Sequence, residues 1–87
     1  MTLKIETASD GQVALLRLIG RLESQHIDEL RAHIRGHQGV AFDLEEVTLV
    51  CVEVVRFLAE CEAAGVELRH CPLFIREWMG REERGDA

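Results

Sequence analysis

The sequence lacks the features that would place it in a membrane or on nucleic acid. No stretch of its 87 residues approaches the roughly 20 consecutive apolar residues that cross a bilayer, and residues 1–6 alternate polar and apolar side chains instead of forming the apolar run of a secretory signal. Positive charge is also scarce, because ten Lys and Arg residues against 16 Asp and Glu residues leave a formal net charge of −6. An acidic chain repels phosphate backbones and anionic lipids, so we expect neither nucleic acid nor a membrane as a partner.

The spacing of a structural metal site is missing as well. Three cysteines and four histidines are present, but His33 and His37 straddle Gly36, and His70 and Cys71 are adjacent, whereas zinc sites usually pair their ligands at a short regular spacing on one element. Three cysteines cannot all pair within one chain, which favours a reducing compartment. We therefore predict no metal site and a cytoplasmic location.

The chain shows no arrangement of nucleophile, base and orienting group. Ser24 has His26 nearby, but its position before an amphipathic run explains it as a helix cap. A phosphate-binding loop opens a helix, whereas the glycines in residues 36–39 precede a strand pattern. The pair Glu45 and Glu46 offers too few oxygen ligands for calcium and is assigned to a solvated loop. We predict no catalytic residue, no cofactor and no enzymatic activity.

Apolar periodicity predicts two strands and a helix in the first half of the chain. Residues 3–6 alternate as in a half-buried strand, and residues 9–11 (Ser-Asp-Gly) predict a hairpin turn. Residues 12–19 are apolar on both parities, which is typical of an inner strand covered on both faces. Residues 25–35 follow Ser24 as N-cap, end before a glycine and predict a helix.

The second half continues with strand, helix, strand and helix. Residues 39–44 form a short apolar run, with Asp43 at its polar end, that predicts a central strand covered on both faces. Residues 52–64 show helical periodicity, residues 66–69 predict another short strand, and residues 73–81 predict a last helix.

The resulting order is ββαβαβα, with no repeat or linker to mark a second domain. It predicts a single α/β domain over residues 1–81, built on a small mixed, mostly parallel four-stranded sheet with packed helices. The N-terminal hairpin supplies the antiparallel edge of this sheet. Residues 82–87 are predicted to form a charged tail that frays.

Three runs of this sequence resemble the STAS family, the domain of bacterial anti-sigma factor antagonists and of the cytoplasmic tails of sulfate transporters. These runs are residues 16–23 (LRLIGRLE), residues 41–50 (AFDLEEVTLV) and residues 65–68 (GVEL), and the resemblance extends from about Leu3 to Met79. It implies a STAS-like fold and a regulatory role in signalling through protein–protein interaction, with an anti-sigma factor-like kinase, a sensor or a signalling complex as the partner.

The chain departs from the family at the start of the helix that follows the central strand. Family members have an Asp-Ser-Ser-Gly-like sequence there, whose first serine is a phosphorylation switch, and the four matching positions here are Cys51, Val52, Glu53 and Val54. No hydroxyl is available for a kinase, and Glu53 is one position late to imitate a phosphoserine at Val52. The resemblance therefore implies docking without serine phosphorylation.

Helical geometry selects the residues that would meet the partner. With Val54, Leu58 and Cys61 facing the core, and Cys61 taken as a buried small hydrophobe, a rotation of about 100° per residue places the other side of the helix in solvent. The predicted partner-binding residues on that side are Val52, Glu53, Arg56 and Ala59.

Two other functions fit the same sequence. The last predicted helix carries Phe74 and Trp78 at i, i+4 spacing, which makes these residues candidates for an oligomer contact in a homodimeric scaffold. A small-molecule or nucleotide-binding subunit would instead have a pocket at the carboxyl ends of the parallel strands, near Asp43 and Cys51.

Overall fold

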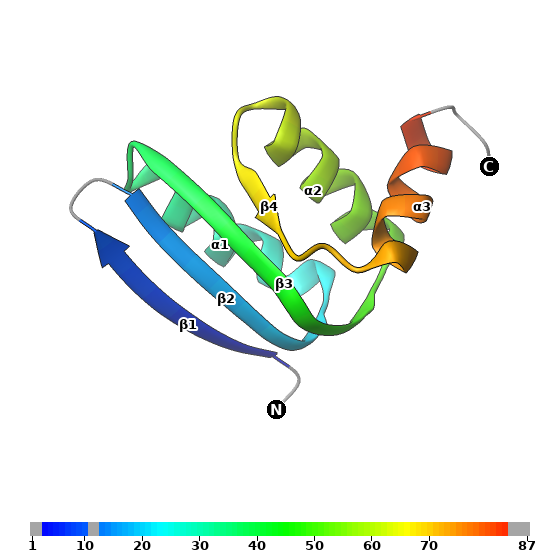
Figure 1. Cartoon of the computed structure of the whole chain (residues 1–87), viewed down its shortest axis with the longest axis horizontal. Helices are drawn as coiled ribbons and strands as arrows, with labels where there is room; N and C mark the ends of the chain where they lie inside the picture. The colour runs from blue at the N-terminus through cyan, green and yellow to red at the C-terminus, as the bar shows by residue number, and fades with distance from the viewer. Residues whose placement is uncertain (1–2, 11–12, 84–87) are drawn as a thin grey trace.

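The described residues form four strands and three α-helices in the predicted order. The computed structural model describes residues 3–10 and 13–83 (Figure 1). The elements are β1 (Leu3–Asp10), β2 (Val13–Leu22), a short 3₁₀ turn η1 (Ser24–His26), α1 (Ile27–Arg35), β3 (Gly39–Val50), α2 (Val52–Ala63), β4 (Glu67–Arg69) and α3 (Leu73–Glu83).

The strands form one sheet in the spatial order β1-β2-β3-β4. β1 runs antiparallel to β2, while β2 and β3, and β3 and β4, pair in parallel. Parallel neighbours require a crossover, and α1 and α2 supply it. The predicted four-stranded, mostly parallel sheet with one antiparallel edge is confirmed.

The helices cover one face of the sheet and leave the other face of β2 partly exposed. In β2, Ala14, Leu16 and Leu18 are fully buried, whereas Val13 is 48% exposed and Arg17 is exposed. Figure 1 shows α1 behind β2 and β3, on the buried side. The prediction that residues 12–19 are covered on both faces is wrong, because Val13 and Arg17, on the other face of β2, are exposed.

One hydrophobic core lies between the sheet and the helices. The rings of Phe42 on β3 and Phe57 on α2 pack with their centroids 6.4 Å apart. Cys61 belongs to the same core, as predicted, and its burial raises the pKa of its thiol to about 11. The largest fully buried side chains include Phe42, Leu16, Leu18, Leu22, Leu30, Leu44, Leu58, Ile75 and Met79.

The central strand is longer than the sequence predicted. β3 continues past Asp43 to Val50, so Glu45 and Glu46 lie within the strand and not in a loop. The register with β2 shifts twice along this extension, which allows Glu46 to pair with Arg17 across the two strands. An irregular ladder of this kind hides the alternation by which a strand is predicted.

The N-terminal hairpin is confirmed, but its strands reach further than predicted. Ser9 and Asp10 belong to β1, opposite Ala14 and Val13, and residues 11–12 lie outside the described residues. At its other end β2 continues to Leu22 through Gly20, whose φ of 104° only glycine adopts readily.

The first helix is not capped by Ser24 as predicted. Ser24 lies inside η1, whose N-cap is Glu23, and the N-cap of α1 is His26. Glu23 and His26 form a reciprocal capping box in which the backbone N–H of Glu23 donates to Nδ1 of His26 at 3.0 Å. Leu30 is fully buried on the inward stripe of α1.

The last helix begins after Pro72 and continues beyond the predicted end at Arg81. The carbonyl of Pro72 accepts hydrogen bonds from the backbone N–H groups of Ile75 and Arg76, each at 3.1 Å. Glu82 and Glu83, the first residues of the predicted tail, belong to α3, while residues 84–87 lie outside the described part of the chain. No helix within the described residues is long and apolar enough to cross a bilayer.

Candidate functional site

The start of α2 is where the sequence placed the partner-binding residues. The helix begins at Val52, as predicted, and follows Cys51, whose backbone is extended and whose side chain makes no capping hydrogen bond. Hydrogen bonds from its own backbone N–H and from the Cys51 thiol hold the pKa of the Glu53 carboxyl below the usual range. A carboxylate in the first turn also interacts favourably with the helix dipole.

The four predicted residues differ in their exposure. Glu53 and Arg56 are exposed, whereas Val52 and Ala59 are partly buried and Ala59 packs against the core. The sequence predicted that Val52 and Ala59 point away from the core, and the structure instead leaves both partly buried. We call these four residues, Val52, Glu53, Arg56 and Ala59, the α2 surface.

Two ion pairs join α3 to α2. Nε of Arg56 donates to Oε1 of Glu82 at 2.8 Å, and Nη2 of Arg76 lies 2.7 Å from Oε2 of Glu62. The pairing of 56 with 82 and of 62 with 76 makes the two helices antiparallel, and Figure 1 shows them side by side. The α2 surface is therefore a strip along the edge of a two-helix layer.

The two residues predicted for an oligomer contact on α3 differ in their exposure. Phe74 is 45% exposed and Trp78 is partly buried against the core. Leu73, beside Phe74, is 73% exposed. The two other apolar residues of this helix, Ile75 and Met79, are buried.

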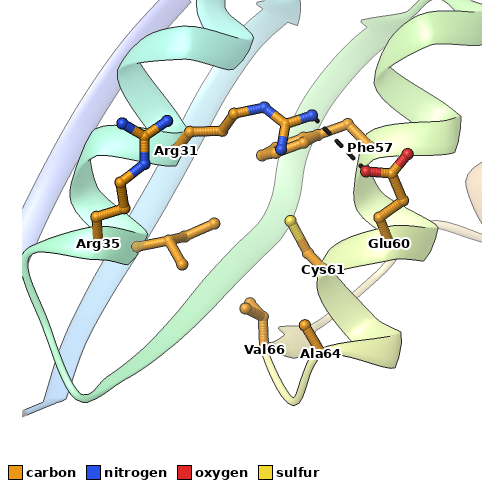
Figure 2. A pocket seen from close by; sticks show the side chains of 8 residues that line it. Arg31, Arg35, Phe57, Glu60, Cys61, Ala64 and Val66 are labelled. Carbon is orange, nitrogen blue, oxygen red and sulfur yellow. Dashed lines mark ion pairs between the residues drawn. The ribbon is translucent and has the colours of Figure 1, made fainter.

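A pocket of about 290 Å³ opens between α1 and α2 (Figure 2). It is lined by Arg31, Ile34, Arg35, Phe57, Glu60, Cys61, Ala64 and Val66. These residues come from the C-terminal turns of both helices and from the segment entering β4, so this pocket lies at the amino ends of the parallel strands. The sequence placed a pocket at the carboxyl ends, near Asp43 and Cys51, and neither of these residues lines this one.

The sequence also missed a polar cluster at the opposite end of β4. Asp43 accepts hydrogen bonds from the backbone N–H of Glu45 at 3.1 Å and from Nδ1 of His70 at 3.3 Å, when that nitrogen carries the proton. The backbone N–H of Glu45 is the main reason that the pKa of Asp43 lies below its usual range. The side chains of Asp43, Glu45 and His70 offer ligand atoms within 4.8 Å of one another, which the reading of Glu45 as a loop residue concealed.

Burial favours the protonated form of two of the three thiols. The pKa of Cys71 is raised by its removal from solvent, and Cys61 has its pKa near 11, so both remain protonated at neutral pH. All three cysteines are free.

Comparisons with known proteins identify the fold. No protein-family model and no curated protein matches the sequence. The structure is similar to a solved structure of the anti-sigma factor antagonist SpoIIAA in its unphosphorylated form, with a TM-score of 0.64 and 14% sequence identity, over 95% of this chain and 82% of that chain. At this identity the likeness establishes the fold, so the STAS-like α/β architecture implied by the sequence resemblance is confirmed.

Proposed function

We propose that this chain is a non-enzymatic, cytoplasmic regulatory module that docks through the α2 surface onto a protein: an anti-sigma factor-like kinase, a sensor or a signalling complex. The observation that supports this most strongly is the likeness to SpoIIAA over nearly the whole chain, since that protein is an anti-sigma factor antagonist. Fold alone does not assign function, so the docking proposal also depends on the chemistry of the α2 surface.

The α2 surface has the composition of a small docking site. Val52 is an apolar residue that is still partly open to solvent, and the opposite charges of Glu53 and Arg56 flank it. An apolar centre with charged neighbours allows burial of the centre while the charges select and orient the partner.

Docking through this surface would not depend on phosphorylation within it. None of Val52, Glu53, Arg56 and Ala59 has a hydroxyl group, and the exposed Thr48 stands four residues before the helix, on β3. Binding would then be controlled by the concentration of the partner.

Affinity capture with matched variants tests the proposal. The test variant combines Val52→Asp, which places a charge on the apolar centre, with Arg56→Glu, which reverses the charge beside it. We expect that the partner protein no longer co-purifies with this variant. The control is Val13→Asp combined with Arg21→Glu, the same two changes at exposed positions of β2. Retention of every co-purifying protein by the first variant, or equal losses from both, would contradict docking through α2.

A homodimer through α3 is a second candidate, because Leu73 and Phe74 expose large apolar side chains next to each other. Trp78 would contribute from the following turn. Light scattering of Phe74→Glu against the parent tests this candidate without disturbing the core. A dimeric parent and a monomeric variant would support it, whereas an unchanged mass would remove α3 from the interface.

A further inference from the structure

The pocket between α1 and α2 has an apolar floor and a charged rim. Figure 2 shows Arg31 and Arg35 on the α1 side and Glu60 and Cys61 on the α2 side. The floor consists of Ile34, Phe57, Cys61 and Val66. The sequence signal for this site is faint, because its residues come from two stretches, 31–35 and 57–66, that are far apart in the chain.

The charges at the rim do not cancel. Arg31 is already engaged: its guanidinium lies 5.0 Å from the centroid of the Phe57 ring, and Nη2 lies 3.7 Å from Oε2 of Glu60. Arg35 is exposed and makes no ion pair with any residue that the structure describes. An acidic chain thus presents one uncompensated guanidinium beside an apolar hollow.

The C-terminal ends of two helices also meet this pocket, and their carbonyl groups would repel an anion if they were open. Other groups already cap several of them. The backbone N–H of Gly36 donates to Ala32 O at 3.1 Å, Nδ1 of His37 lies 2.9 Å from His33 O, and the backbone N–H of Val66 donates to Cys61 O at 2.9 Å. The guanidinium of Arg35 therefore remains the group at the rim best able to attract a ligand.

We infer that this pocket binds a small amphipathic carboxylate, a free medium-chain carboxylic acid in its ionised form. Its carboxylate would accept hydrogen bonds from Arg35, with Arg31 adding positive charge, and its alkyl chain would lie on the apolar floor. A cavity of about 290 Å³ is at the lower end for small-molecule sites and suits one alkyl chain better than a nucleotide. The inference does not depend on the proposed docking function.

A titration of the full-length, ¹⁵N-labelled chain followed by NMR tests the inference with octanoate as the probe. We expect saturable amide shifts centred on the end of α1, the end of α2 and Val66. Octan-1-ol lacks the charge and acetate lacks the chain, so each should bind at least tenfold more weakly than octanoate.

Three variants distinguish binding of octanoate in this pocket from non-specific attraction of the anion to positive charge. Arg35→Ala should weaken octanoate binding roughly tenfold or more, because a charge-assisted hydrogen bond is lost. Ala64→Phe fills the pocket from an exposed position and should abolish binding. Arg21→Ala removes the same charge from β2 and should leave the affinity unchanged, and amide dispersion reports whether each variant is folded.

Several results would overturn the inference. These are the absence of shifts at the pocket in the parent chain, equal binding of octanol and octanoate, and an equal loss of affinity in Arg35→Ala and Arg21→Ala. Folded Ala64→Phe that binds like the parent would exclude the pocket as the site. Each result leaves the docking proposal intact, since Val52 and Arg56 are unchanged in all three variants.

Discussion

Phe57 connects the core of this protein with its surface. The ring is 2% exposed, packs against Phe42 in the core and supports the guanidinium of Arg31 on its other side. The inward stripe predicted for α2, which consists of Val54, Leu58 and Cys61, does not include Phe57. A stripe that also includes the i+3 positions would have found it.

Removal of the Phe57 ring should be one of the most destabilising single changes in the chain. Phe57→Ala leaves a cavity in the core and is expected to lower the free energy of unfolding by about 3–5 kcal/mol. Phe74→Ala removes the same atoms from a side chain that is 45% exposed, and the loss should be below about 1 kcal/mol. Urea denaturation measures both, and similar losses from the two variants would contradict this account of the core.

Cys61 makes the stability of the protein sensitive to alkaline pH. Its pKa is about 11 in the folded chain and lies near 8.5 when the thiol is in water, so the folded state holds the proton more tightly. This contribution is complete below pH 8.5 and is lost as the pH rises toward 11. The chain has one lysine and no tyrosine, so few other groups titrate in this range.

The test compares the parent with Cys61→Val between pH 8 and 10.5. The free energy of unfolding of the parent should fall by roughly 1–2 kcal/mol more than that of the variant, because only the parent has a buried thiol at this position. Parallel pH profiles would show that Cys61 contributes nothing to the alkaline sensitivity.

At the scale of elements, the contact between α2 and α3 affects which side chains of the α2 surface are available to a partner. Arg56 was predicted as a docking residue, and the structure also places it in an ion pair with Glu82. No sequence pattern could have predicted this pair, because its two residues are 26 positions apart and the second was assigned to the tail.

A double-mutant cycle separates the two roles of Arg56. Arg56→Glu should destabilise the fold slightly, and Glu82→Arg in the same chain should recover about 0.2–1 kcal/mol, the range measured for exposed ion pairs. Partner capture should not recover in the double variant if Arg56 itself contacts the partner. Recovery of capture together with stability would assign Arg56 to holding α3.

The ends of the helices provide a second element-scale prediction. Gly65, after α2, has a φ of 104°, whereas Gly36, after α1, has a φ of −83° that any residue adopts. Gly65→Ala should therefore cost about 1 kcal/mol or more, and Gly36→Ala should be neutral or stabilising by up to about 1 kcal/mol. Thermal unfolding of the two variants measures the contrast, and equal shifts would contradict it.

For the whole molecule, the sequence predicted the order of the elements and the topology of the sheet. Short apolar segments and turn residues mark where each element lies. Which faces of the sheet are covered depends on where the helices pack, and the alternation in residues 12–19 could not reveal that Val13 would be 48% exposed. The full length of β3 was equally hidden, because Glu46 fits a loop until its ion pair with Arg17 on β2 is seen.

The candidate site was predictable only in part, for the same reason. The start of α2 at Val52 follows from local periodicity, whereas the partial burial of Val52 and Ala59 depends on tertiary packing that this periodicity does not reveal. The pocket and the cluster around Asp43 depend on segments that meet only in the folded chain.

Site-specific photo-crosslinking tests the central claim, docking through α2, most directly. A photoreactive residue is introduced at Glu53 on the α2 surface or at Arg21 on β2, both exposed positions, in the cell that produces the protein. We predict a crosslink to one partner protein from position 53 and none to that protein from position 21. A partner crosslinked from position 21 and not from position 53 would contradict the claim.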